Sequence, residues 1–142
     1  MCRFRKMKRE QKNSALKIAD SGIIIFQQDI RAVQLAKSAI CAGIYSLINE
    51  VNIGIEDIDK LLLAGGFGSY IDVKNAGIIG LIPKEFVLKT TPIGNAAGMG
   101  AVSILLSEKQ GNKTFLLAEK SEIVDLSSSA YFMEKYVECM IF

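Results

Sequence analysis

The sequence predicts an α/β domain of layered helices and strands, and three observations carry this prediction. A short apolar run at residues 61–64 ends in glycines at 65, 66 and 68, as a buried strand does when it turns toward a helix. Short strand-like runs alternate with stretches of helical period in the order β-β-α-β-α-β-α. Half of the 142 residues are hydrophobic and few are aromatic, which suits helices packed closely on a sheet.

Charge and hydropathy limit the classes of partner. The net charge is only +2, but residues 1–12 hold six Lys and Arg against one Glu. We interpret residues 1–13 as a solvated basic tail and residues 14–142 as one domain. The tail has no interleaved aromatic residues and no RNA-binding motif, so we expect no nucleic-acid partner. No apolar run approaches the ~18 residues of a membrane span, so we expect no membrane partner.

The reactive residues are few. Cys2, Cys41 and Cys139 are isolated and show no CxxC spacing, which argues against a disulfide framework and a metal or iron–sulfur site. We expect free cysteines in a reducing cytoplasm and no metal ligands in this chain. The sequence has no His, so any catalysis would rest on carboxylates, lysines, backbone groups or a borrowed metal.

The first half begins with two strands, at 14–19 and 23–26, around a turn at 20–22. A helix over 28–51 follows, with Asp29 in its first turn and Gly54 as the glycine that ends it. Its apolar residues recur at three- and four-residue steps: Ile30, Val33, Ala36, Ile40, Ile44, Leu47, Ile48 and Val51.

After the glycines, a short helix should run to residue 79, with Asp72 as its N-cap or as a metal ligand, and end before Pro83. Residues 86–93 favour a strand, followed by a helix to 108 with Asn95 as N-cap. A turn at 110–112, a helix at 113–120 and a strand at 122–126 come next. Serines 127–129 should cap a last helix with an apolar stripe: Phe132, Met133, Tyr136, Val137 and Met140.

The glycine pattern matches neither common nucleotide motif. A dinucleotide fingerprint would place a third glycine at position 71, which is Ile71, and no glycine cluster is followed by the Lys-Ser or Lys-Thr of a P-loop. Glycines at the end of a strand allow either close helix packing or close approach of a ligand. The pattern alone leaves both alternatives open.

A resemblance extends this interpretation. The run Ala64-Gly65-Gly66-Phe67-Gly68 resembles the adenosine loop of the actin-like ATPases, which include acetate and sugar kinases, heat-shock chaperones and actin. Residues 23–142 resemble more closely the C-terminal domain of the reductive activators of corrinoid proteins, through motifs in the family's order and spacing. These motifs are QQDIR at 27–31, QLAK at 34–37, AGGFG at 64–68, YID at 70–72, IGLIP at 79–83, GNAAG at 94–98 and the closing residues 132–142. Phe26 departs from the family's usual capping Thr.

The resemblance implies a fold and a function. The fold would be half of an actin-like, ribonuclease H-like ATPase domain, truncated at its N-terminus, with a mixed sheet flanked by helices. Full-length relatives carry a [2Fe–2S] domain and use ATP with Mg²⁺ to return cob(II)alamin of a corrinoid protein to cob(I)alamin for methyl transfer. This chain lacks the cluster-binding cysteine run and both phosphate loops, so we expect no cluster and no turnover by the chain alone.

The resemblance also implies site residues. The adenosine moiety would pass Gly65, Gly66, Phe67 and Gly68. Candidates on the long helix that flanks the adenine are Gln34, Lys37 and Ser38, and Gly94 and Asn95 would shape the cleft. For Lys37 the alternative is an exposed helix lysine, and for Gly94 and Asn95 it is close helix packing.

Two other functions stay open from the sequence. One is a non-catalytic module that docks a corrinoid protein or redox partner, or forms a homodimer, through apolar residues such as those of the last helix. The other is a small-molecule kinase of the same superfamily, against which the missing phosphate loops also argue.

Overall fold

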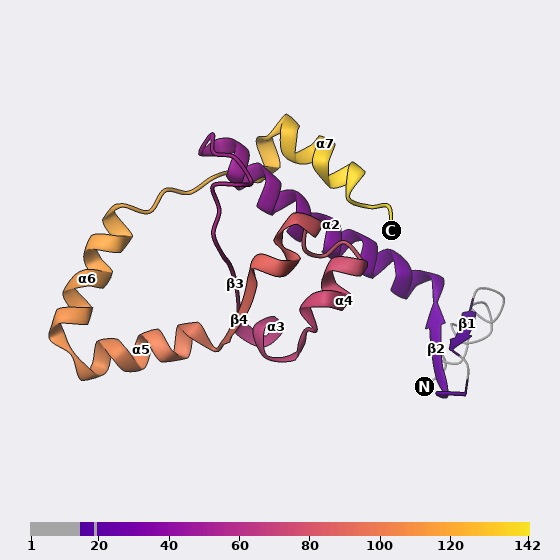
Figure 1. Cartoon of the computed structure of the whole chain (residues 1–142), viewed down its shortest axis with the longest axis horizontal. Helices are drawn as coiled ribbons and strands as arrows, with labels where there is room; N and C mark the ends of the chain where they lie inside the picture. Colours follow the sequence, from indigo (N-terminus) through magenta and orange to yellow (C-terminus); the bar gives the residue numbers. More distant parts are fainter. Residues whose placement is uncertain (1–14, 19) are drawn as a thin grey trace, which may run out of the picture.

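The computed structural model describes residues 15–18 and 20–142, so the predicted basic tail lies outside the described part. The chain is an α/β protein, as predicted, but its described strands form two separate two-stranded sheets in place of the one mixed sheet that the resemblance implied. Strands β1 (Ala15–Ile18) and β2 (Ile23–Phe26) form an antiparallel hairpin, and β3 (Leu61–Ala64) and β4 (Thr90–Gly94) form a parallel pair. Figure 1 shows the hairpin at one end of the molecule and the parallel pair near its middle.

The long helix α2 (Gln27–Glu50) organises the body of the molecule. Phe26 offers no capping oxygen, but Asp29 accepts a hydrogen bond from the Phe26 backbone N–H at 2.8 Å, which ties the first turn to the preceding strand. The prediction that Gly54 ends this helix is wrong. Asn52 takes the left-handed conformation there with φ of 51°, and the Gly54 N–H donates to Asp57.

Short helices connect the parallel strands: α3 (Gly65–Tyr70), α4 (Val73–Ile78) and the 3-10 helix η2 (Lys84–Lys89). Asp72 caps α4 by accepting from the Asn75 N–H at 2.7 Å, which confirms the N-cap alternative. The strand predicted over 86–93 begins only at Thr90. Its first residues form η2, where Lys89 donates to the Ile58 carbonyl at 2.7 Å and fixes the loop before β3.

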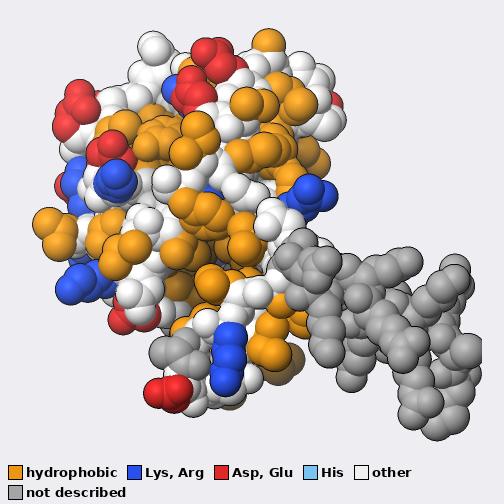
Figure 2. Space-filling model, turned by 90° about the vertical axis from the view of Figure 1, so that its right-hand side faces the viewer, with side chains coloured by type: hydrophobic (Ala, Val, Ile, Leu, Met, Phe, Trp, Pro, Cys, Tyr) orange, Lys and Arg blue, Asp and Glu red, His pale blue; other side chains and the backbone are white. Residues whose placement is uncertain are grey.

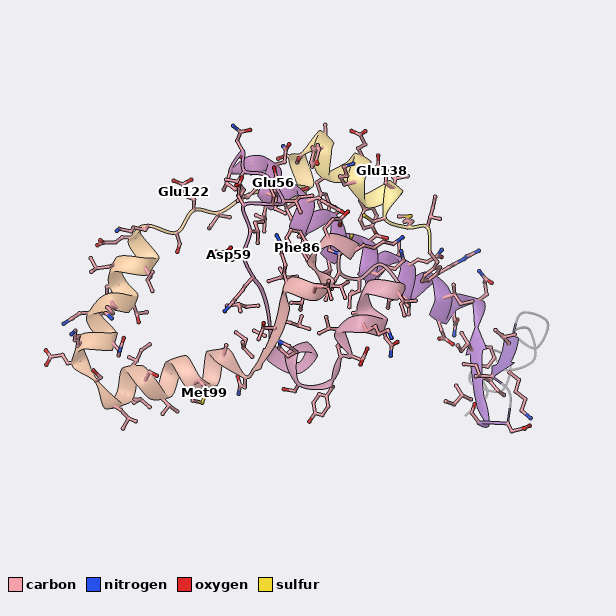
Figure 3. The ribbon with its side chains drawn as sticks, viewed as in Figure 1. Glu56, Asp59, Phe86, Met99, Glu122 and Glu138 are labelled. Carbon is pink, nitrogen blue, oxygen red and sulfur yellow. The ribbon has the colours of Figure 1, made fainter. Side chains whose placement is uncertain are left out.

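The core lies where α2, β3, α4 and η2 meet. Phe86 is fully buried and packs with Ala76 and Ile82. Half-buried side chains surround this centre: Ile44, Ile48, Ile55, Ile58, Leu61, Leu63, Ile71, Val73 and Leu81. Figure 3 shows Phe86 between the parallel strands and α2. Of the apolar face predicted for α2, Ile44 and Ile48 pack against this core. Most of that face stays exposed, including Val33, Ile40, Leu47 and Val51, so the predicted burial of the whole face is wrong.

Helices α5 (Ala96–Leu106) and α6 (Glu108–Glu119) extend away from this core, and neither has a buried residue. Figure 1 shows them as an arm that returns through a long segment to α7. Asn95 caps α5 by accepting from the Gly98 N–H at 3.0 Å, as predicted. The turn predicted at 110–112 is wrong, because these residues lie inside α6. The strand predicted at 122–126 is also wrong, because the structure gives residues 122–125 no regular secondary structure. The 3-10 helix η3 (Leu126–Ser128) begins at the last residue of that range.

The last helix, α7 (Ala130–Glu138), lies along α2 (Figure 1). Ser129 caps it by accepting from the Phe132 N–H at 3.2 Å, in agreement with the predicted serine cap. Phe132 and Tyr136 of its apolar stripe are half-buried, with ring centroids 5.8 Å apart, whereas Met133 and Val137 are exposed. In the described part of the chain, no helix is long and apolar enough to cross a bilayer.

Candidate functional site: a glycine junction and a C-terminal clasp

The two glycine clusters meet at one edge of the parallel pair. Ala64 at the end of β3 pairs with Gly94 at the end of β4, so the junction after each strand opens on the same side. Gly65 and Gly94 both have positive φ, of 79° and 60°, a conformation that suits glycine. The structure therefore brings residues 65–68 and 94–95 together, as a shared site would require.

The glycines of this junction differ in what surrounds them. A Cβ atom added at Gly68 would overlap the Leu63 carbonyl oxygen and lie 3.3 Å from the Gly94 nitrogen. Gly68 is therefore a packing residue that lets α3 approach the ends of both strands. A Cβ added at Gly65 or Gly66 would meet nothing within 4 Å. The backbone at these two positions is therefore open, and packing does not require the absence of a side chain there.

The three candidates on α2 lie in another environment. Lys37 is only 1% exposed, and its Nζ donates to the carbonyls of Cys139 at 2.5 Å and Ile141 at 2.7 Å. The same ammonium lies 4.8 Å from the centre of the Phe142 ring. Lys37 is thus not an exposed lysine, and its ammonium is held by main-chain carbonyls.

Gln34 and Ser38 belong to the same cluster. Gln34 Nε2 donates to the Met140 carbonyl at 3.2 Å, and Ser38 Oγ donates to the Gln34 carbonyl at 2.5 Å. We call the contacts of Gln34 and Lys37 with residues 139–142 the C-terminal clasp. The structure does not bring these side chains together with Gly65–Gly66, and their predicted contact with an adenosine stays a prediction.

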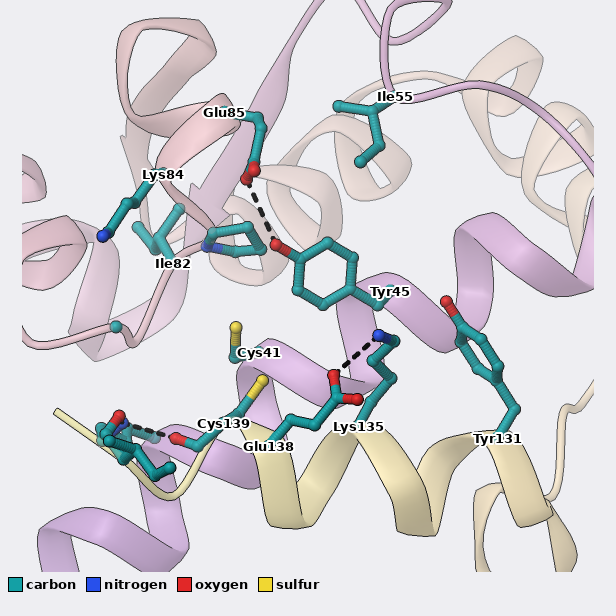
Figure 4. A pocket seen from close by; sticks show the side chains of 14 residues that line it. Cys41, Tyr45, Ile55, Ile82, Lys84, Glu85, Tyr131, Lys135, Glu138 and Cys139 are labelled. Carbon is teal, nitrogen blue, oxygen red and sulfur yellow. Dashed lines mark hydrogen bonds and ion pairs between the residues drawn. The ribbon is translucent and has the colours of Figure 1, made fainter.

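Beside the clasp, a cavity of about 520 Å³ lies between α2, η2 and the end of α7. Lys37, Cys41 and Tyr45 line it from α2, and Glu138 and Cys139 line it from the end of α7. Figure 4 shows the two cysteine side chains and the Tyr45 ring around this space. Tyr45 Oη donates to Glu85 Oε2 at 3.2 Å, which links α2 to η2.

Burial changes the acidity of two groups in this cavity. Burial, together with the neighbouring Cys139 thiol, raises the pKa of Cys41 from 9.0 to about 12. Burial and the carboxylate of Glu85 likewise raise the pKa of Tyr45 above its ordinary value. Both groups are therefore neutral at physiological pH. Among the described residues, no three His, Cys, Asp or Glu side chains gather as metal ligands.

Comparison with protein families decides the identity of the domain. The family model described as the C-terminal domain of RACo, the ASKHA domain, matches residues 3–142.

The chain belongs to this family.

The relatives of this ASKHA domain are corrinoid activators. A corrinoid activation enzyme, RamQ, from Eubacterium limosum is 41% identical over 115 residues, which are 81% of this chain and 19% of that protein. A [Co(II) methylated amine-specific corrinoid protein] reductase from Methanosarcina barkeri is 28% identical over 103 residues, or 72% of this chain and 19% of that protein. The chain thus spans about a fifth of these relatives.

A solved structure carries the same fold. The reductive activator for corrinoid,iron-sulfur protein superposes with a TM-score of 0.77 at 30% sequence identity, over 96% of this chain and 24% of that one. The predicted half-domain of an actin-like ATPase is therefore confirmed at the level of fold.

The sequence did not reveal the clasp. One sequence feature could have indicated the clasp: a set of small or polar residues that share one face of α2. All of its members are buried: Lys37, Ser38, Cys41 and Ala42. Such a set marks a second packing face on a helix whose first face is plainly apolar. The chain position of its partner, about 100 residues downstream, has no local signature.

Proposed function

We propose that this chain supplies the adenosine side of the nucleotide site in an ATP-dependent reductive activator, which returns a corrinoid protein from cob(II)alamin to cob(I)alamin. The family membership and the names of the relatives support the role in corrinoid activation. Because the chain covers about a fifth of the curated relatives, the remaining parts of the site would come from outside the matched region. Alone, the chain would bind nucleotide weakly and would not hydrolyse it.

One observation carries the nucleotide proposal: the open backbone at Gly65 and Gly66. These residues follow a parallel strand directly, at the edge where α/β sheets bind ligands. Both positions leave room for a ligand against the main chain, whereas Gly68 has no such room. Gly94 and Asn95 would form the adjoining wall, although the Asn95 side chain already serves as the cap of α5.

The cofactors implied by the relatives fit this chain unequally. Gly65 and Gly66 fit an adenosine, because a flat ring or a sugar can lie against backbone that carries no side chain. When bound, Mg-ATP would supply the phosphoryl chemistry, for which this chain offers no phosphate loop. A [2Fe–2S] cluster does not fit, because the three cysteines are widely separated in sequence and no cluster-binding run is present.

The direct test is a titration of the isotopically labelled chain with Mg-ATP, followed by amide chemical shifts. We expect a dissociation constant on the order of 0.1–1 mM. The largest shifts should fall on the amides of residues 64–68 and 94–95. Gly66→Val should abolish these shifts, because its branched side chain fills the space that the ligand would use.

The same titration contains its controls. The amide spectrum of Gly66→Val reports directly whether the variant is folded, so a lost response in a native-like spectrum reports a lost ligand contact. Gly66→Ala is the smaller change, since a Cβ at this position meets nothing within 4 Å. Adenosine without phosphates should shift the same amides if the site is an adenosine half-site. Shifts confined to the clasp residues 34–38, or an unchanged response in Gly66→Val, would contradict the proposal.

A second candidate function, docking or dimerisation, is favoured by the apolar surface of α5. Its large side chains are exposed, with Leu105 at 85% and Leu106 at 82%. Figure 3 shows Met99 pointing away from the rest of the molecule on the same helix. Figure 2 shows further hydrophobic side chains across the face that is seen from the right-hand side of Figure 1. Contiguous exposed apolar surface of this kind marks an interaction site.

We expect the isolated chain to self-associate through α5, as measured by multi-angle light scattering over a range of concentrations. The double substitution Leu105→Glu and Leu106→Glu should shift the population to monomer, because it places two like charges on the contact. Leu88→Glu is the matched control, since Leu88 is 98% exposed but lies on η2. A monomeric wild-type chain at millimolar concentration, or equal effects of both variants, would count against this role.

A further inference from the structure

The cavity beside the C-terminal clasp contains two thiols from distant parts of the chain. Cys41 lies in the middle of α2 and is buried, and Cys139 follows the last residue of α7 and is half-buried. Both side chains line the same cavity, and Cys139 is one of the groups that raise the pKa of Cys41. Figure 4 shows both sulfur atoms at this cavity, one from α2 and one from the end of α7.

We propose that Cys41 and Cys139 form a reversible disulfide when the protein meets a low-molecular-weight disulfide, and that this bond locks residues 139–142 onto α2. Helices α2 and α7 pack against each other, and this packing brings Cys41 and Cys139 to the same cavity. The bond would close a loop of about 100 residues, and a cross-link restricts the unfolded chain more as the loop grows longer.

The chemistry is thiol–disulfide exchange, and its steps balance. The more exposed Cys139, as thiolate, attacks one sulfur of the small disulfide, which releases one small thiolate and leaves a mixed disulfide on Cys139. Cys41 then loses its proton and attacks the Cys139 sulfur, which releases the second small thiolate. Two electrons pass from the protein sulfurs to the small disulfide, and the two protons pass to the released thiolates.

The surroundings assign this order of attack. Buried Cys41 holds its proton tightly, with a pKa of about 12, so it is a poor first nucleophile. Three groups face it: the Lys37 ammonium on α2 favours its thiolate, whereas the Glu85 carboxylate on η2 and Cys139 at the end of α7 oppose it. Once Cys139 carries the mixed disulfide, Cys41 is the thiol next to it, and this proximity favours its attack despite its high pKa.

The lock would act on contacts that already exist. Lys37 and Gln34 hold the carbonyls of residues 139–141 in the reduced protein, so the disulfide would cross-link two segments that are already in contact. The oxidised chain would therefore keep its fold and gain resistance to unfolding. Reduction by a dithiol would restore the free thiols and the original stability, which makes the contact responsive to oxidants.

The test uses Cys2→Ser protein, which leaves these two cysteines alone, incubated with oxidised glutathione in the folded state. We expect free thiols to disappear and the intact mass to fall by two hydrogen atoms. Trypsin should then release the peptide 38–60 linked to the peptide 136–142. The oxidised protein should melt several degrees higher than the reduced protein, and dithiothreitol should reverse both changes.

Controls make each outcome decisive. In 8 M urea the linked peptide should be replaced largely by separate glutathione adducts, because native proximity is lost. Cys139→Ser should give neither the linked peptide nor the rise in melting temperature. Separate adducts on the folded protein, thiols that stay free, or links between two chains would overturn the proposal. The main measurement needs no substitution at either thiol, so it stands even if a variant fails to fold.

Discussion

Replacing Lys37 with Met is expected to lower the free energy of unfolding by about 3 kcal/mol. Met keeps most of the aliphatic stem but removes the ammonium that binds the carbonyls of Cys139 and Ile141. Hydrogen bonds from charged donors contribute about 1.5–3 kcal/mol each, and part of this is offset because a buried charge no longer needs to be desolvated. The loss should appear in urea unfolding as a lower midpoint with an unchanged slope.

The effect should concentrate at the end of the chain. Without the ammonium, residues 139–142 lose their main anchor, and we expect their amide hydrogens to exchange faster than those of the core around Phe86. Lys135→Met is the matched control, since that lysine pairs at 2.7 Å with exposed Glu138 on the surface of α7. It should change stability by less than about 1 kcal/mol. Equal stability of the two variants would show that the clasp contributes nothing to folding.

Local signals explain what the sequence predicted well. The strand at 61–64, the caps at Asp72 and Asn95, and the long helix all depend on residues within a few positions of one another. Each has a physical cause that local sequence shows. An apolar run predicts the strand, a side-chain oxygen beside free N–H groups predicts each cap, and a 3.6-residue period predicts the helix. The structure adds the parallel pairing of the two strands, which places both glycine junctions at one edge.

The failures have physical reasons of two kinds. Gly111 and Asn112 suggested a turn, yet they lie inside α6, where neighbours of good helix propensity outweigh their cost. Residues 86–89 have strand-like composition, yet Phe86 is drawn into the core and Lys89 into the loop carbonyls, and η2 forms instead. Local helix propensity therefore decided the first segment, and tertiary contacts decided the second.

The site was predictable only in part for the same reason. Glycines after a strand are a local feature, but whether each one is open or packed depends on where the neighbouring strand lies. Lys37 became a candidate through the family resemblance, because the long helix flanks the adenine there. Its partner in the structure is a backbone segment about 100 residues downstream, whose carbonyls carry no sequence signature. A lysine that binds main-chain oxygens looks, in sequence, like any other lysine on a helix.

Adding a single methyl group at Gly68 is expected to cost about 3 kcal/mol of stability. The new Cβ of Gly68→Ala would overlap the Leu63 carbonyl oxygen and lie 2.9 Å from the Leu63 carbonyl carbon. These are backbone atoms at the end of a paired strand, so they cannot rotate away as a flexible side chain can. Either α3 must shift off the sheet or the bulged end of the β3–β4 pair must open. Thermal unfolding would measure the loss.

Gly66→Ala tests the opposite expectation two residues away. Its Cβ meets nothing within 4 Å, and alanine favours the helix, so stability should be unchanged or rise by up to about 1 kcal/mol. If Gly66→Ala and Gly68→Ala were equally destabilised, both glycines would be packing residues. The open backbone at Gly66 would then give no support for a ligand site. If Gly66→Ala folds as well as the wild type yet weakens Mg-ATP binding, packing explains Gly68 and only a ligand explains Gly66. The two substitutions therefore separate the structural glycine from the functional one within a single turn of chain.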